Sequence, residues 1–249
     1  KPLVYLDSAN SSQKPKVVID KISNFYETEF SNVGRSVHTL AVKATNRFEA
    51  VRDKVKQYIN AKHREEIIFT KGATEGINLV ASSFGKKYIN KGDEILVTEL
   101  EHHSNYVPWH YLRSEKGAVI KFAQVNSDGD VEIDEIKKQI TNKTKIIAIT
   151  HISNVTGAVL PITKIVDLAK EKNIPVLIDG TQGAPHSHID MQKIGCDFYA
   201  ISCHKMYGPN GIEILNKKKK WVDDLPPYQG GGGMIDEVKQ DSITYAEEH

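Results

Sequence analysis

The feature that most constrains the fold is a regular alternation of short apolar segments with longer amphipathic segments. The apolar segments have the length of β-strands, and the amphipathic segments carry apolar residues at helical spacing. The predicted strands cover residues 66–69, 94–97, 119–122, 145–149, 175–178, 198–201 and 211–215. The predicted helices cover residues 16–30, 44–59, 74–88, 106–114, 133–140 and 162–172. This alternation predicts an α/β fold with a mostly parallel, seven-stranded sheet and helices on both faces.

Length, charge and cysteine content narrow the class of protein. A chain of 249 residues can bury a sizeable core, and a formal net charge of +1 gives no reason to propose nucleic acid or an anionic membrane as partner. No apolar run of about 18 residues is present, and residues 1–7 have the pattern of a short strand, not of a signal peptide. Two cysteines make no disulfide framework, so we expect a reducing, cytoplasmic location. A plastid-type organelle is the alternative if a presequence has been removed. The basic run 217–220 is expected to be a solvated turn.

Ligands of such sheets bind beyond the carboxyl ends of the strands, so polar residues directly after predicted strands are the candidates for a site. Residues 70–76 lie between a strand and a helix. The free N–H groups and positive end of that helix, with the hydroxyl of Thr74, suit a phosphate group. An ordinary helix N-cap explains the same residues, and both interpretations stay open.

Two further segments follow predicted strands. Residues 101–105 contain His102, whose flat imidazole suits stacking on an aromatic cofactor and proton transfer. His102 and His103 also suit a cap or a metal site, but no other ligands have convincing metal-site spacing. Asn154 follows the strand at 145–149 and suits a substrate carboxylate, with a turn asparagine as the alternative.

The last two segments carry a carboxylate and an amine. Asp179 ends a buried apolar strand, where a carboxylate is costly unless a cation or hydrogen bond compensates it. It suits a protonated pyridine nitrogen, a helix N-cap or a metal. Lys205 follows the strand at 198–201, in a segment that ends with Gly208 and Pro209. A solvated lysine is the alternative. Together the segments supply an amine, an anion and a phosphate cradle, which is what pyridoxal 5′-phosphate requires.

At this point the chain resembles the Suf-type cysteine desulfurases of the class V aminotransferase-like group, across essentially its whole length. The motifs that carry the resemblance are YLDSA (5–9), RSVHTL (35–40), TEGINLV (74–80), EHHSN (101–105), SNV (153–155), DGTQ (179–182) and HKMYGP (204–209). The resemblance implies the large domain of a fold-type-I pyridoxal phosphate-dependent homodimer. It also implies an N-terminal arm over residues 1–20, a cofactor-binding domain over 21–249, and no small C-terminal domain in this chain.

The resemblance further implies roles for the catalytic residues. Lys205 would hold the cofactor as a Schiff base, and Asp179 would keep the pyridine nitrogen protonated. His102 would stack on the ring and move protons. Gln182 would bond the phenolic oxygen of the cofactor.

The remaining implied roles concern the phosphate and the substrate. Thr74, Ser202 and His204 would hold the phosphate, together with Ala73, which stands where a threonine is usual. For the substrate, Asn154 would help bind the carboxylate, and Arg35 is the other expected substrate-binding residue.

The reaction implied is conversion of L-cysteine to L-alanine, with the sulfur passed to an enzyme thiol as a persulfide and then to an acceptor protein for iron–sulfur cluster assembly. Neither Cys196 nor Cys203 aligns with that thiol, so we expect the 249 residues alone to be inactive. Cys196 is expected to be a small packing residue, and packing is also the expectation for Cys203. Glu213 departs from the family pattern because it stands in a strand that is normally small and apolar.

Two alternatives to the desulfurase remain. One is another enzyme of the same superfamily, such as a selenocysteine lyase, a kynureninase-like hydrolase or an epimerase. The other is a non-catalytic, truncated remnant that binds the cofactor or a partner.

Overall fold

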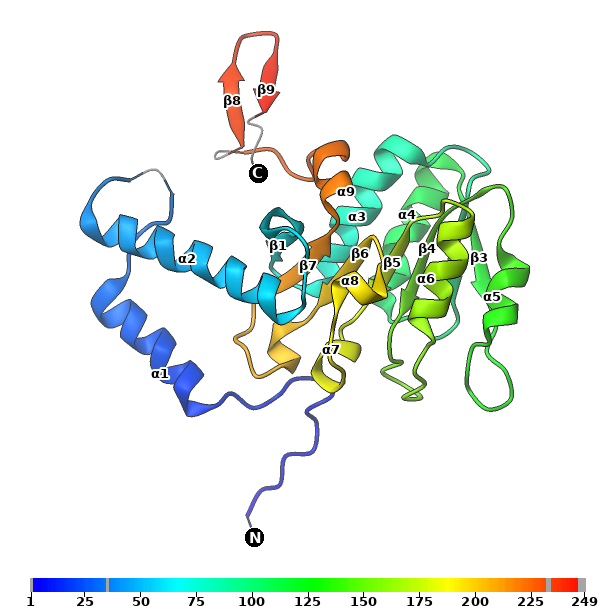
Figure 1. Cartoon of the computed structure of the whole chain (residues 1–249), viewed down its shortest axis with the longest axis horizontal. Coiled ribbons are helices and arrows are strands. Elements are labelled where there is room, and N and C mark those ends of the chain that lie inside the picture. The colour runs from blue at the N-terminus through cyan, green and yellow to red at the C-terminus, as the bar shows by residue number, and fades with distance from the viewer. Residues whose placement is uncertain (1, 35, 232–233, 246–249) are drawn as a thin grey trace.

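A seven-stranded sheet forms the centre of the computed structural model, which describes residues 2–34, 36–231 and 234–245 (Figure 1). Its strands are Ile67–Thr70 (β1), Glu94–Thr98 (β2), Val119–Ala123 (β3), Thr144–Thr150 (β4), Val176–Asp179 (β5), Phe198–Ile201 (β6) and Glu213–Lys217 (β7). Their order across the sheet is β1-β7-β6-β5-β4-β2-β3. The neighbours from β6 to β3 pair in parallel, and β7 runs antiparallel between β1 and β6.

Successive residues of each strand enter two separate hydrophobic cores, one on each face of the sheet. In β4, Ile147 and Ile149 belong to one core, whereas Ile146 and Ala148 belong to the other. Side chains alternate along a strand, so an apolar run such as this one fits a strand that is buried on both faces.

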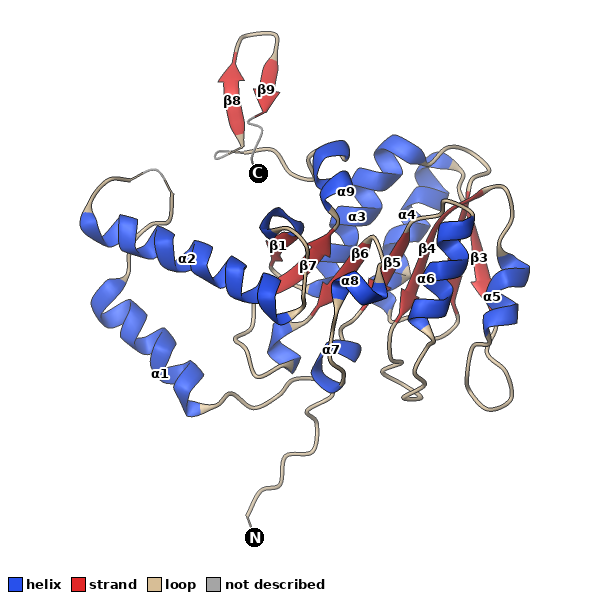
Figure 2. Ribbon diagram, viewed as in Figure 1, coloured by secondary structure: helices blue, strands red, loops and turns tan. Residues whose placement is uncertain are grey.

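Helices cover both faces (Figure 2). The core that contains Ile146 is closed by Ala73–Tyr88 (α3) and Val107–Lys116 (α4), and Trp109 of α4 is fully buried there. The opposite core is closed mainly by Ile133–Gln139 (α5), Ile162–Glu171 (α6) and Met191–Ile194 (α8). The predicted α/β fold, with a mostly parallel seven-stranded sheet and helices on both faces, is confirmed.

Several elements extend away from this layered body, although the C-terminal part of the long helix at 39–58 packs on it through Phe48 and Val55. Lys16–Asn24 (α1), the π-helical turn Phe25–Glu29 and Thr39–Tyr58 (α2) project to one side of the sheet (Figure 1). α1 buries none of its residues. The expected boundary at residue 20 falls within α1. A hairpin of Ile235–Val238 (β8) and Ile243–Tyr245 (β9) extends away from the central sheet, at the top of Figure 1.

Some elements differ from the sequence prediction. The helix expected at 44–59 begins earlier, at Thr39, after His38 accepts a capping bond from the Ala41 N–H. The short helices Gly183–His186 (α7), α8 and Lys219–Asp224 (α9), and the hairpin, were not predicted because each is too short for a periodic signal.

The prediction of a solvated turn at 217–220 is wrong. Lys217 ends β7 and is buried, because it pairs with Phe198 of β6, and α9 begins at Lys219. Burial lowers the pKa of Lys217 to about 8. Within the described residues, no helix is long and apolar enough to cross a membrane.

Candidate active site

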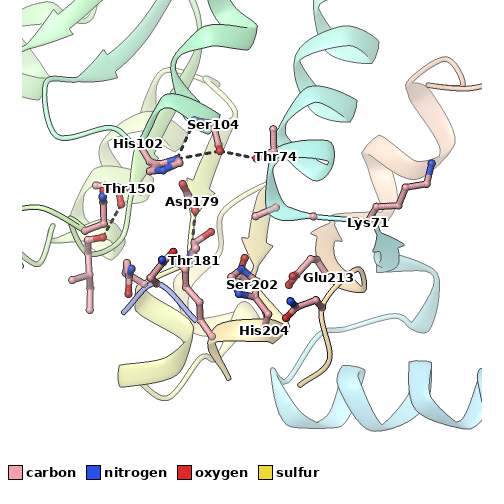
Figure 3. A pocket seen from close by; sticks show the side chains of 18 of the residues that line it. Lys71, Thr74, His102, Ser104, Thr150, Asp179, Thr181, Ser202, His204 and Glu213 are labelled. Atoms are coloured by element: carbon pink, nitrogen blue, oxygen red, sulfur yellow. Dashed lines mark hydrogen bonds between the residues drawn. The ribbon is translucent and has the colours of Figure 1, made fainter. Parts of the chain in front are cut away.

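A cavity of about 370 Å³ opens at the carboxyl ends of the parallel strands (Figure 3). It is lined by side chains that were predicted to follow different strands. Those that line it are Ala73, Thr74, His102, Asn154, Asp179, Gln182, Ser202, His204 and Lys205. Arg35, the other predicted substrate-binding residue, lies outside the described residues. The topology thus brings together predicted site residues up to 132 positions apart in the chain, from Ala73 to Lys205.

Lys205 ends a short 3-10 turn, Cys203–Lys205, that directly follows β6. The turn is closed by Tyr207, whose φ of 65° lies in the left-handed region, and by Gly208. A Cβ on Gly208 would lie 3.0 Å from the Cys203 carbonyl oxygen, so glycine permits this close approach. Burial lowers the pKa of Lys205, which increases the fraction of neutral, nucleophilic amine.

Asp179 is the last residue of β5 and is only 3% exposed. Its Oδ1 accepts a hydrogen bond of 3.0 Å from the Thr181 N–H. The carboxylates of Asp179 and Glu213 both act to raise the pKa of Lys205 and so oppose the effect of burial. The carboxylate and the amine therefore share one cavity and interact electrostatically, and a cation bound there would compensate the buried charge.

A chain of hydroxyl contacts connects the start of α3 with His102. Thr74 Oγ1 lies 2.7 Å from Ser104 Oγ, and Ser104 Oγ lies 3.0 Å from His102 Nδ1 (Figure 3). The Ser104 N–H also donates to His102 Nδ1 at 3.1 Å. These contacts fix the imidazole beside the N-terminal end of a 16-residue helix, where free N–H groups favour an anion.

Glu101 holds the loop that carries His102 and Ser104 in place through hydrogen bonds. Its carboxyl group accepts hydrogen bonds from Thr98 Oγ1 (2.7 Å), Asn105 Nδ2 (2.6 Å) and the Thr150 N–H (2.9 Å), so it joins the ends of β2 and β4. Burial, with a smaller contribution from Asp179, raises the pKa of Glu101 to about 8. The group is therefore mostly protonated at neutral pH.

The N-terminal segment packs on the lysine-bearing turn. The His204 carbonyl accepts hydrogen bonds from Ser12 Oγ (3.0 Å) and Lys14 Nζ (2.7 Å). The His204 ring contacts Ser11 Oγ at 3.2 Å. The side-chain amide of Gln182 lines the cavity and donates to the Ala9 carbonyl at 2.7 Å.

Several residues of the cavity had been given no site role from the sequence. Ser104 and Lys71 lie within segments already identified, so their neighbours were the signal. Glu213 is the first residue of β7, which runs antiparallel, and a search after strand ends misses it. The other such residues are Asn10, Gly72, Thr150, Ile152, Thr181, Asn210 and Gly211.

The two thiols are poorly suited to nucleophilic attack. Cys196 is fully buried, and burial raises its thiol pKa well above the usual range. Burial and the neighbouring Glu213 raise the pKa of Cys203 to about 12. Since the thiolate is the reactive form, both stay inert near neutral pH. Among the described residues, no group of three or more His, Cys, Asp or Glu side chains is placed to hold a metal ion.

Comparison with known proteins identifies the family. The model of the aminotransferase class-V family matches residues 4–249. The chain belongs to this family. A probable cysteine desulfurase of Halalkalibacterium halodurans is 46% identical over 246 residues, which are 99% of this chain and 61% of that protein. The chain thus spans about three fifths of the length of this class-V relative.

Solved structures of class-V cysteine desulfurases share the fold. The S-sulfonic acid form of an Escherichia coli enzyme aligns with a TM-score of 0.90 at 38% identity, over 97% of this chain and 61% of that one. The apo enzyme of Thermococcus onnurineus aligns with a TM-score of 0.93 at 33% identity, over 98% and 61%.

Pyridoxal 5′-phosphate is the cofactor of these class-V enzymes, and the side chains in the cavity fit it. A half-buried amine of lowered pKa suits its aldehyde, and a buried carboxylate suits its pyridine nitrogen. The N-terminal end of α3, with hydroxyl groups beside it, suits its phosphate.

Proposed function

We propose that this chain is the cofactor-binding part of a cysteine desulfurase, which converts L-cysteine to L-alanine and transfers the sulfur. The observation that carries the proposal is the convergence of Lys205, Asp179 and the N-terminal end of α3 on one cavity. The resemblance to cysteine desulfurases over 99% of the chain supports this choice among pyridoxal phosphate reactions.

In this proposal the cofactor is held at three points. Thr74, Ser202 and His204 hold the phosphate at the N-terminal end of α3. Asp179 would bind the pyridine nitrogen and keep it protonated, and Gln182 would bond the phenolic oxygen. The favourable helix end and a charge-assisted bond to Asp179 would together orient the ring.

In this proposal Lys205 and His102 transfer protons. When bound, pyridoxal phosphate draws electrons away from the Cα atom of an attached amino acid and so acidifies its proton. The Lys205 amine, with its lowered pKa, can take up that proton at Nζ and deliver it again. His102 would stack on the ring and move protons at its imidazole. Asn154 would help bind the substrate carboxylate, and Arg35 is the other substrate-binding residue of this proposal.

The sulfur-accepting thiol lies elsewhere. Cys196 and Cys203 both have strongly raised pKa values, so neither supplies a thiolate near neutral pH. We therefore propose that the 249 residues bind cofactor and substrate but do not complete turnover alone. The same proposal divides the chain into an arm over residues 1–20 and a cofactor domain over 21–249. It also includes a homodimer, a cytoplasmic location and an acceptor protein that serves iron–sulfur cluster assembly.

The test uses two proteins: the chain itself, and the chain fused to the remaining part of the Halalkalibacterium halodurans relative. Each is loaded with pyridoxal phosphate and given L-cysteine, and L-alanine and sulfide are measured. We expect L-cysteine to change the cofactor spectrum of both, and alanine to form only with the fused protein. A parallel reaction with L-selenocysteine separates desulfurase from selenocysteine lyase. A cofactor spectrum that L-cysteine leaves unchanged in both proteins contradicts the proposal.

A further inference from the structure

Glu213 brings a buried carboxyl group into the cofactor cavity. It is the first residue of β7 and is only 2% exposed. In the sheet it pairs with Thr70, the last residue of β1, which leads into the N-terminal end of α3. It lines the same cavity as Ala73 and Ser202, and its carboxyl group is bonded to Cys203, the residue after Ser202, so it lies beside the residues proposed to hold a phosphate (Figure 3).

The Glu213 carboxyl group is also bonded to the lysine-bearing turn. The Cys203 N–H donates a hydrogen bond to Glu213 Oε2. This bond, with a contribution from the His204 N–H and the charges of Lys14 and Lys205, favours the ionised carboxylate. Burial is the larger effect and raises the pKa of Glu213 to about 7. The group therefore changes its charge near neutral pH.

The other titratable groups of the cavity do not remove this dependence. Burial lowers the pKa of His204 and of Lys205, so both carry less positive charge near neutral pH than ordinary side chains of their kind. Lys71 lines the cavity from the turn before α3, but its side chain is exposed and lies 3.9 Å from Glu75. Asp179 adds a second negative charge from the end of β5. Ala73, at the start of α3, offers no hydroxyl group. A protonated Glu213 would supply an O–H donor at this end, whereas an ionised one adds a negative charge to the cavity.

We propose that Glu213 makes cofactor retention depend on pH, because its protonated form accepts the phosphate of the cofactor and its ionised form repels it. The inference rests on the proposed function, since it requires a phosphate-bearing cofactor in this cavity. By linkage, a bound phosphate dianion favours the protonated carboxyl group, and protonation strengthens phosphate binding by the same factor. The contribution of Glu213 to cofactor affinity therefore falls as pH rises through neutrality.

The experiment measures the affinity of the apo-protein for pyridoxal phosphate by absorbance between about pH 6 and 8. Glu213→Gln keeps an oxygen that can accept the Cys203 N–H but carries no charge. We expect the wild-type affinity to fall with pH by about tenfold more than that of Glu213→Gln, equivalent to a shift of roughly one pKa unit. Pyridoxal, which has no phosphate, should give the same profile with both proteins.

Glu66→Gln is the matched control. Glu66 is also buried, and its carboxylate accepts the N–H groups of Lys62, His63 and Lys219, but it does not line this cavity. This variant should keep the wild-type profile. A second measurement needs no variant: calorimetry in buffers of different ionisation enthalpy should show net proton uptake on binding pyridoxal phosphate, and less on binding pyridoxal.

Three outcomes overturn the inference. The first is that wild type and Glu213→Gln have equal pH profiles with pyridoxal phosphate, and the second is that their profiles differ as much with pyridoxal as with pyridoxal phosphate. The third is that binding pyridoxal phosphate takes up no more protons than binding pyridoxal. In each case a cofactor that still attaches to Lys205 leaves the proposed function standing. Failure of every variant and of the wild type to bind pyridoxal phosphate at Lys205 overturns both.

Discussion

The hydroxyl group of Ser12 donates a hydrogen bond of 3.0 Å to the carbonyl of His204, across 192 positions of the chain. Ser12 Oγ also accepts the Tyr207 N–H at 2.8 Å, so one buried serine holds the residues on both sides of Lys205. The position of the reactive amine therefore depends on the N-terminal segment as well as on β6.

Replacing Ser12 with Ala should destabilise the protein. The change removes the acceptor of the Tyr207 N–H and the donor to the His204 carbonyl, and each lost hydrogen bond costs about 0.5–1.5 kcal/mol. Urea unfolding measures the loss, and the rate of cofactor attachment should fall with it. Ser114→Ala is the control, because that hydroxyl only bonds the His110 carbonyl on the exposed side of α4. Equal stability of the two variants would show that the N-terminal segment does not hold the turn.

Replacing Asp179 with Asn should slow exchange of the substrate Cα proton by several powers of ten, because an unprotonated pyridine ring is a poor electron sink. Proton NMR in deuterated water with L-alanine measures this step without requiring a sulfur-accepting thiol. The control is Asp197→Asn. Asp197 is also buried and accepts the Val176 N–H at 3.0 Å, but it does not line the cavity. Wild-type exchange in Asp179→Asn would refute the role of this carboxylate.

The raised pKa of Glu101 predicts how stability depends on pH. The folded protein holds this proton up to about pH 8, whereas the unfolded chain releases it near 4.5. The folded state thus binds more protons in between, so the free energy of unfolding falls as pH rises across that window. Glu101→Gln should reduce this fall, on the order of 1–3 kcal/mol.

Urea unfolding at the two ends of that window measures the effect of Glu101→Gln. Glu115→Gln, at an exposed position of α4, should leave the wild-type slope unchanged. A slope that is equal in wild type and Glu101→Gln would mean that the Glu101 carboxyl is already ionised in the folded protein.

Much of the fold and of the cavity could be predicted from local signals. Asp179 and Lys205 each follow a buried apolar strand, and parallel strands deliver such residues to one edge of the sheet. Glu213 could not be placed in this way. Its strand runs antiparallel, so its first residue, not its last, reaches that edge.

The contacts that hold the site could not be predicted either, because they join distant parts of the chain. The bond from Ser12 to His204 leaves no periodic signal, and neither does the bond from Gln182 to Ala9. The buried Lys217 was mistaken for a solvated residue because three further lysines follow it. Strand pairing with Phe198, which the sequence does not display, decides its burial.

The central claim is that Lys205 is the amine that holds the cofactor. The most direct measurement loads the protein with pyridoxal phosphate, reduces it with borohydride and locates the modified lysine by peptide mass spectrometry. We expect the label on Lys205, and we expect Lys205→Ala to lose both the label and the visible absorption band of the lysine-bound cofactor. A label on another lysine such as Lys71, or an absorption band that persists in Lys205→Ala, would contradict the account.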